Sequence, residues 1–252
     1  MTTACPKRKF PSGAALPRSP LDSAMMKWLR RLPEAPVTAV LIAANLGIYV
    51  WMMWVSGMKS GFDYATMTYF GANVVGTGQD ASHWRWVTAA FVHFNPVHIA
   101  MNLWVLAQIG VVFERTLGSA IVAVGYVLTG VLGNVLSSGF NAWRHQYDQS
   151  AGASGAIMGL IGIAAAYAWR TQQKGIARSL ALNVVFILVV GYFINLDNAA
   201  HLGGFLSGGL IGLVRARWPQ RLPRWLDATL IGASAAVSVA AFVIIRAYHG
   251  YH

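Results

Sequence analysis

The stretch GASGAIMGLIGIAAAYA, residues 152–168, holds no charged side chain and is rich in small and apolar residues. It lies within an uncharged window, 149–169, of 21 residues. A helix needs about 20 mostly apolar residues to cross the hydrocarbon of a bilayer, so this window predicts one membrane span. Working outward from it, six further windows of 17–28 residues are also free of charge: 35–58, 86–113, 116–143, 179–196, 198–214 and 228–245. The sequence therefore predicts seven transmembrane helices.

The composition of the whole chain agrees with this interpretation. Of its 252 residues, 56% are hydrophobic and 11% are charged, whereas soluble domains have roughly 45–50% apolar and about 25% charged residues. This composition argues against a soluble globular enzyme, and the fold class expected is an all-α polytopic membrane protein. Helices are expected at approximately 37–57, 95–113, 117–138, 153–170, 178–196, 199–216 and 227–246.

The net charge of +11 carries a topology signal. When the basic residues are assigned to the two sides of a seven-helix protein, 15 lie on the side of the N-terminus and 4 on the other. Cytoplasmic loops carry the excess of Lys and Arg, so we expect a cytoplasmic N-terminus and an outside C-terminus. Because the basic residues sort by membrane side and not around a binding motif, no nucleic-acid partner is expected.

The chain divides into three parts by these patterns. Residues 1–35 form a basic cytoplasmic tail, expected to be disordered, with the one cysteine of the chain, Cys5, so no intramolecular disulfide can form. Residues 36–217 form a membrane domain of six helices, and 218–252 supply a linker and a seventh helix. The outside connection 58–94 is too long for a plain linker and is rich in aromatic residues, which predicts a partly ordered element at the membrane interface.

Polar residues inside membrane spans are costly and mark functional sites. His98 and Asn102 lie four residues apart and so share one face of the second helix. Ser154 begins the fourth helix among glycines, and His201 begins the sixth. Because helices 2, 4 and 6 all start from the outside, these four side chains are expected at one depth, just below the outer surface.

These residue types suit acyl transfer. A serine hydroxyl becomes a nucleophile when an imidazole accepts its proton, and Asn, His and a backbone N–H at a helix N-terminus can stabilise an oxyanion. Small residues four apart let two helices approach closely. Such faces run beside the serine and the second histidine, at Gly155 and Gly159 and at Gly204, Gly208 and Gly212. Gly152 is also expected to serve helix packing near the site.

Several motifs in order give the chain a family resemblance over roughly residues 37–216. They are Trp84-Arg85 with Thr88, His93, His98 with Asn102, Phe113-Glu114-Arg115 followed by Gly118, Gly152-Ala153-Ser154-Gly155, and Ala200-His201 followed by Gly204 and Gly208. With these motifs the sequence resembles the rhomboid intramembrane serine proteases. The resemblance implies a six-helix bundle with one additional C-terminal helix, which we expect to be peripheral.

The resemblance also implies roles for individual residues. Ser154 would be the nucleophile and His201 the general base of a dyad without an acidic third member, and His98, Asn102 and the Ser154 N–H would form the oxyanion hole. One departure is Met158, which stands where some bacterial members have a tyrosine that stacks on the catalytic histidine. A thioether can contact an imidazole less rigidly than a ring does.

Other residues are expected to have structural roles. Trp84 and Arg85 are interpreted as anchors of the outer loop, His93 as a residue that holds this loop, and Glu114 as a buried acid with a donor partner. The resemblance further implies that substrates enter beside helix 5, about 181–195, under the loop 195–198.

The expected function is therefore that of a serine-type endopeptidase acting on the transmembrane segments of other proteins. Its partners would be transmembrane protein substrates and the lipid bilayer; no cofactor and no metal is expected, and the oligomeric state stays open. The chain has no His-Glu-x-x-His motif, no acidic residue within any of the seven uncharged windows and no Walker sequence. A bacterial plasma membrane is expected, with an organelle membrane as the alternative. A catalytically inactive client-binding relative and a small transporter are the two other functions that the sequence leaves open.

Overall fold

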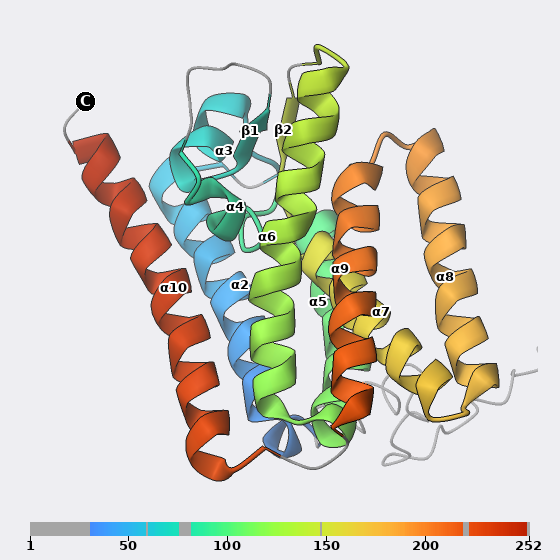
Figure 1. Cartoon of the computed structure of the whole chain (residues 1–252). Helices are drawn as coiled ribbons and strands as arrows, with labels where there is room; N and C mark the ends of the chain where they lie inside the picture. The colour runs from blue at the N-terminus through green and yellow to red at the C-terminus, as the bar shows by residue number, and fades with distance from the viewer. Residues whose placement is uncertain (1–30, 59, 76–81, 147, 219–221, 251–252) are drawn as a thin grey trace, which may run out of the picture.

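The computed structural model describes residues 31–58, 60–75, 82–146, 148–218 and 222–250 (Figure 1). Most of the tail assigned to 1–35 lies outside these residues, as does Cys5. The long helices are α2 (Pro36–Ser56), α5 (Pro96–Leu117), α6 (Ser119–Trp143), α7 (Ser154–Arg170), α8 (Lys174–Phe193), α9 (Asn198–Arg217) and α10 (Arg224–Gly250). The shorter elements are the 3-10 helix η1 (Leu32–Glu34), α3 (Tyr64–Phe70), β1 (Asn73–Val75), α4 (Arg85–Thr88) and β2 (Asp148–Ser150).

The all-α membrane fold is confirmed. Six helices of the described chain, all the long ones except α7, are long and apolar enough to cross a bilayer. The helix expected as the fourth span is present as α7, but its 17 residues make it shorter than the six candidate spans. A helix of this length rises about 26 Å, less than the roughly 30 Å of the hydrocarbon. A helix this short can begin with Ser154 below the membrane surface.

The short helix α7 lies at the centre of the bundle, packed against α9, α6, α8 and α5 (Figure 1). Twelve of its 17 residues are buried. Its closest neighbour is α9, and the approach depends on glycine. A Cβ at Gly204 would collide with the carbonyl of Gly155, and one at Gly208 with the carbonyl of Gly159. The serine and the second histidine therefore sit on two helices whose backbones touch.

Side chains at the helix ends define where the other site elements begin. Asn95 caps α5 by accepting the N–H of His98 at 2.9 Å, ahead of Pro96 at the first helical position. Asp197 caps α9 by accepting the N–H of Ala200 at 2.9 Å. These two caps fix the first turns of α5 and α9.

The buried acid Glu114, near the C-terminal end of α5, connects this helix to the starts of α2 and α6. Its carboxylate accepts the N–H groups of Val37 and Thr38 at 2.9 and 2.7 Å, at the start of α2. It also accepts the hydroxyl groups of Thr38 and of Ser119, the first residue of α6. Its expected donor partners are thus the orphan N–H groups of one helix start and two hydroxyl groups.

The described residues of the connection 58–94, called the outer loop after its expected side, form α3, β1 and α4. Arg85 is buried, and its guanidinium donates to the carbonyls of Thr68 and Ala72 at 2.5 and 3.2 Å, while lying 4.4 Å from the Trp84 ring. β1 pairs antiparallel with β2, with Asn73 opposite Ser150. This pairing ties the outer loop to the segment that leads into α7.

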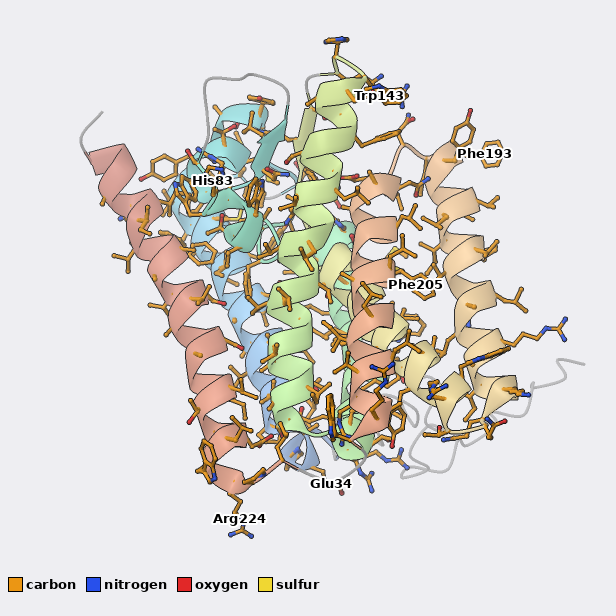
Figure 2. The ribbon with its side chains drawn as sticks, viewed as in Figure 1. Glu34, His83, Trp143, Phe193, Phe205 and Arg224 are labelled. Carbon is orange, nitrogen blue, oxygen red and sulfur yellow. The ribbon has the colours of Figure 1, made fainter. Side chains whose placement is uncertain are left out.

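The seventh helix is not as peripheral as expected. α10 contacts α6, and it also contacts α4 and α3 of the outer loop. Figure 2 labels Glu34 and Arg224 at one end of the bundle and His83, Trp143 and Phe193 at the other, so α10 starts at the same end as α2 and runs toward the outer loop. Composition alone showed that α10 is a span, but not which helices it packs against.

Candidate active site

Ser154 and His201 meet between α7 and α9. Ser154 is the first residue of α7, and His201 lies in the first turn of α9. Their Oγ and Nε2 atoms are 2.8 Å apart, a hydrogen bond between two side chains that are 47 residues apart in sequence. The His201 side chain is only 3% exposed. An imidazole at this distance can accept the serine proton directly.

The second nitrogen of His201 is not paired with an acid. Among the residues that the structure describes, no hydrogen-bond partner faces its Nδ1 atom. Asp197, four residues earlier, directs its carboxylate to the N–H of Ala200 and to the hydroxyl of Ser137 on α6, at 2.9 and 2.5 Å. Ser154 and His201 thus form a pair without a third, acidic member, because the nearby Asp197 carboxylate caps α9.

The turn before Ser154 requires glycine. Gly152 has φ of +121°, in a region that side chains rarely adopt. A Cβ there would lie 2.6 Å from Cε1 and 2.7 Å from Nε2 of His98, and 3.6 Å from Nδ2 of Asn102. Gly152 was expected to serve helix packing. In the structure it instead lets the backbone of the turn approach the two donor side chains of α5.

His98 and Asn102 are held in place on the first turns of α5. The His98 ring stacks on Phe94 with an interplanar angle of 16° and a centroid distance of 5.8 Å, and meets the edge of His93. Asn102 is buried, and its Nδ2 donates to the carbonyl of His98 at 3.1 Å. The backbone N–H of Ser154, in the first turn of α7, has no partner within its own helix. The side chains of His98 and Asn102 thus lie beside the turn at Gly152, and the Ser154 N–H belongs to the same turn.

His93 links the outer loop to this turn, which gives its expected loop-holding role a specific form. Its Nδ1 lies 3.3 Å from the carbonyl of Phe91, and its Nε2 accepts the N–H of Ala153 at 3.3 Å. Burial, with a smaller contribution from His98, lowers the pKa of His93 to about 3. The ring is therefore neutral at pH 7, which leaves one nitrogen to donate and the other to accept.

The remaining site residues pack around this centre. Thr129 on α6 fills the space beside Gly159, and its hydroxyl donates to the carbonyl of Gly125 at 2.6 Å. Met158 is buried within the main hydrophobic core. Asp197 is the residue that the sequence reasoning missed, since it was considered only as part of a loop. An Asp just before an apolar helical stretch was a recognisable capping signal.

The family of the chain is clear from comparison with known proteins. The model of the rhomboid domain matches residues 80–218, more than half of the chain and the part that holds the site. The chain therefore belongs to the rhomboid family, and it is an integral multi-pass membrane protein.

Relatives in bacteria and in a parasite carry protease names. The chain is 30% identical over 199 residues to a rhomboid protease GlpG from Photorhabdus laumondii, which covers 74% of this chain and 62% of that protein. It is 29% identical over 180 residues to rhomboid-like protease 2 of Toxoplasma gondii, covering 69% and 62%, respectively. A rhomboid protease GluP from Bacillus subtilis is 31% identical over 148 residues, covering 57% and 28%. The matched segments thus span less than two thirds of these relatives.

Proposed function

We propose that the protein is an intramembrane serine endopeptidase that hydrolyses a peptide bond in or near a transmembrane segment of another protein. The observation that carries the proposal is the 2.8 Å contact between Ser154 Oγ and His201 Nε2 at the start of two touching helices. Relatives named as rhomboid proteases support the same reaction.

The reaction begins with proton transfer from the Ser154 hydroxyl to Nε2 of His201. The oxygen attacks the carbonyl carbon of the scissile bond, and the tetrahedral intermediate collapses as His201 returns the proton to the leaving amine. An ester then joins Ser154 to the new carboxyl end of the substrate. A water molecule, deprotonated by His201, hydrolyses this ester and frees the serine.

The oxyanion of both tetrahedral intermediates would be held beside Gly152. His98, Asn102 and the N–H of Ser154 supply the donors, and the N-terminus of α7 adds its positive dipole end. Because these donors are fixed by packing and capping before substrate arrives, they need not reorganise during the reaction.

The transmembrane substrate would reach the site between α5 and α8. α8 is loosely packed, since only Ala177, Val184 and Gly191 are buried along its length. On the outer turns of α5, Val97, Met101 and Trp104 are 63–68% exposed. These apolar surfaces suit a membrane-embedded segment. One hydrogen bond crosses the loop above them, from Asn198 Nδ2 to the carbonyl of Leu188 at 2.9 Å.

The site would face the outer side of a bacterial plasma membrane, with the N-terminus in the cytoplasm. This orientation follows the 15-to-4 distribution of basic residues. A shallow position suits hydrolysis because water reaches it without a deep channel through the hydrocarbon.

An activity-based fluorophosphonate probe tests the proposal on the full chain in membranes. Wild type is expected to become labelled at Ser154, Ser154→Ala to lose the label, and His201→Ala to react far more slowly. Labelling of Ser154→Ala at the wild-type level would overturn the mechanism. Absence of labelling in wild type would instead favour an inactive client-binding protein, and solute flux that survives both substitutions would favour a transporter.

A further inference from the structure

The seventh helix has its most buried side chains in its outer half. Only 11% of the most apolar stretch of α10 is buried, so most of its surface faces lipid. Ala241 and Ile245 are the exceptions, with exposures of 4% and 1%. At the other end of α10 the Asp227 carboxylate accepts the N–H of Ala120 at 3.1 Å, near the start of α6. The N-terminal end of α10 is thus held by a hydrogen bond to α6, and its C-terminal half packs against the bundle through Ala241 and Ile245.

What the outer half of α10 touches is the outer loop. The Phe242 ring meets the buried Phe91 ring edge-on, with 6.1 Å between the centroids and 71° between the planes. Cδ1 of Ile245 lies 2.9 Å from the position that a Cβ of Gly71 would take. The carbonyl of Gly71 accepts the hydroxyl of Thr88 at 2.7 Å. α10 therefore packs on both segments that this hydrogen bond joins, the one at Gly71 and the one from Thr88 to Phe91.

One polar contact extends this surface. Arg246 Nη1 donates to the Tyr69 hydroxyl on α3 at 3.0 Å, and the guanidinium lies 5.2 Å from the centre of the Trp51 ring on α2. A long arginine at the outer end of a span thus covers aromatic residues of two other elements.

The same loop holds the turn before the nucleophile. The carbonyl of Ala89 accepts the N–H of Gly152 at 2.8 Å. Two residues after Ala89, the carbonyl of Phe91 lies 3.3 Å from Nδ1 of His93 and orients this ring, whose Nε2 accepts the N–H of Ala153. From Phe242 to Ser154 the contacts are continuous: ring on ring, carbonyl to imidazole, and imidazole to the peptide next to the serine.

We propose that α10 is a positioning element of the active site, in which Phe242 and Ile245 fix the loop segment 88–93 that aligns the turn at Gly152 and Ser154. The inference rests on the proposed protease function. Its physical basis is that catalytic groups must be held within about 0.5 Å of the productive geometry by packed surroundings. α10 and α8 lie at opposite edges of the bundle (Figure 1), so α10 would influence turnover without contacting the transmembrane substrate.

The test compares Phe242→Ala with Val243→Ala in the full chain reconstituted in liposomes. Val243 is 60% exposed on the same helix and provides a matched truncation that faces lipid. The reporter is a single-pass protein whose transmembrane segment is rich in small and helix-destabilising residues. Turnover is expressed per Ser154 site that the fluorophosphonate labels at saturation, so loss of folded protein does not enter the result.

Phe242→Ala is expected to lower kcat about tenfold at nearly unchanged KM, since small misplacements of catalytic groups cost rate more than binding. Val243→Ala is expected to match wild type, and Phe242→Tyr, which retains the ring, to recover most of the turnover. A wild-type kcat per labelled site in Phe242→Ala would overturn the inference, as would an equal loss in Val243→Ala. If Phe242→Ala yields no folded protein, Phe242→Leu is measured, and wild-type turnover there contradicts the inference equally.

Failure of the protease function itself has a different signature. Wild type that neither cleaves the reporter nor reacts with the probe would overturn the proposed function. Wild type that cleaves, with Phe242→Ala cleaving equally well, would overturn only the role of α10.

Discussion

At the scale of residues, the site depends on where a few backbone groups are placed. Gly152 keeps the turn free of a side chain, so that His98 and Asn102 can reach the position beside Ser154. The contact between Ser154 and His201 joins two helix starts, each fixed by its own neighbours. The proposed chemistry therefore depends on donors held by capping and stacking, and not on an additional charged group.

Truncation of the amide donor tests the proposed oxyanion hole. Asn102→Ala is expected to lower kcat by about 10²-fold with little change in KM, because its Nδ2 would bind the developing oxyanion and not the ground-state substrate. Initial rates over a range of reporter concentrations in liposomes measure both constants. Thr116→Ala is the control, since this side chain makes the same type of bond to the carbonyl four residues earlier on α5. Equal rates for the two variants would contradict the role of Asn102.

The cap of α9 makes a second prediction at this scale. Asp197→Ala removes the acceptor for the Ala200 N–H and the partner of Ser137, and is expected to destabilise the protein by about 1 kcal/mol. Asp197→Asn retains a capping oxygen and should keep most of the stability. Thermal unfolding midpoints in detergent compare the variants. An equal loss in both would show that the negative charge, and not the cap, stabilises this helix start.

At the scale of elements, the bundle is organised by the contact between α7 and α9. Every fourth residue on α9 along this contact is glycine, at 204, 208 and 212, and each faces a backbone carbonyl of α7. Without side chains between them, the two backbones come close enough for Ser154 and His201 to form a hydrogen bond.

A single methyl group should disturb this contact. Gly208→Ala places a Cβ against the Gly159 carbonyl and is expected to lower the free energy of unfolding by about 1–3 kcal/mol, with loss of cleavage as the helices separate. Gly209→Ala is the matched control because nothing lies within 4 Å of its Cβ position. Thermal unfolding and reporter cleavage should separate the two variants. If Gly208→Ala is as stable as Gly209→Ala, the backbone contact is not essential.

Much of the element structure followed from charge spacing and polar residues inside spans. All seven expected helices are present, and the structure brings the four polar side chains of the site together at the starts of α5, α7 and α9. Two features depend on tertiary contacts and were beyond sequence patterns. The windows showed that 228–245 is apolar, but lipid and protein are equally apolar surroundings, so nothing indicated that Phe242 faces Phe91. The positive φ of Gly152 likewise appears only once the turn is built.

At the scale of the whole molecule, the protein is a bundle with a short central helix and two contrasting edges. The proposed substrate path lies at the α5 and α8 edge, where large apolar side chains are exposed. The outer loop and α10 occupy the other edge (Figure 1). This arrangement separates the surface that would receive a substrate from the contacts that hold the catalytic turn.

The orientation of the molecule is testable with its one cysteine. Cys5 is expected on the cytoplasmic side, so a membrane-impermeant maleimide should label it in inverted vesicles and not in intact cells. A Cys5→Ser chain with Trp143→Cys, at the end of the bundle opposite Glu34, should show the reverse pattern. Labelling of Cys5 in intact cells would contradict the orientation and place the site on the cytoplasmic side.

The central claim is that Ser154 and His201 together cut a peptide bond of a membrane protein. The most direct measurement is to co-reconstitute the chain with a single-pass reporter in liposomes and map new N-termini by mass spectrometry. Wild type is expected to produce one new N-terminus within or beside the transmembrane segment, and Ser154→Ala and His201→Ala to leave the reporter intact. Cleavage at the same bond by Ser154→Ala would contradict the account.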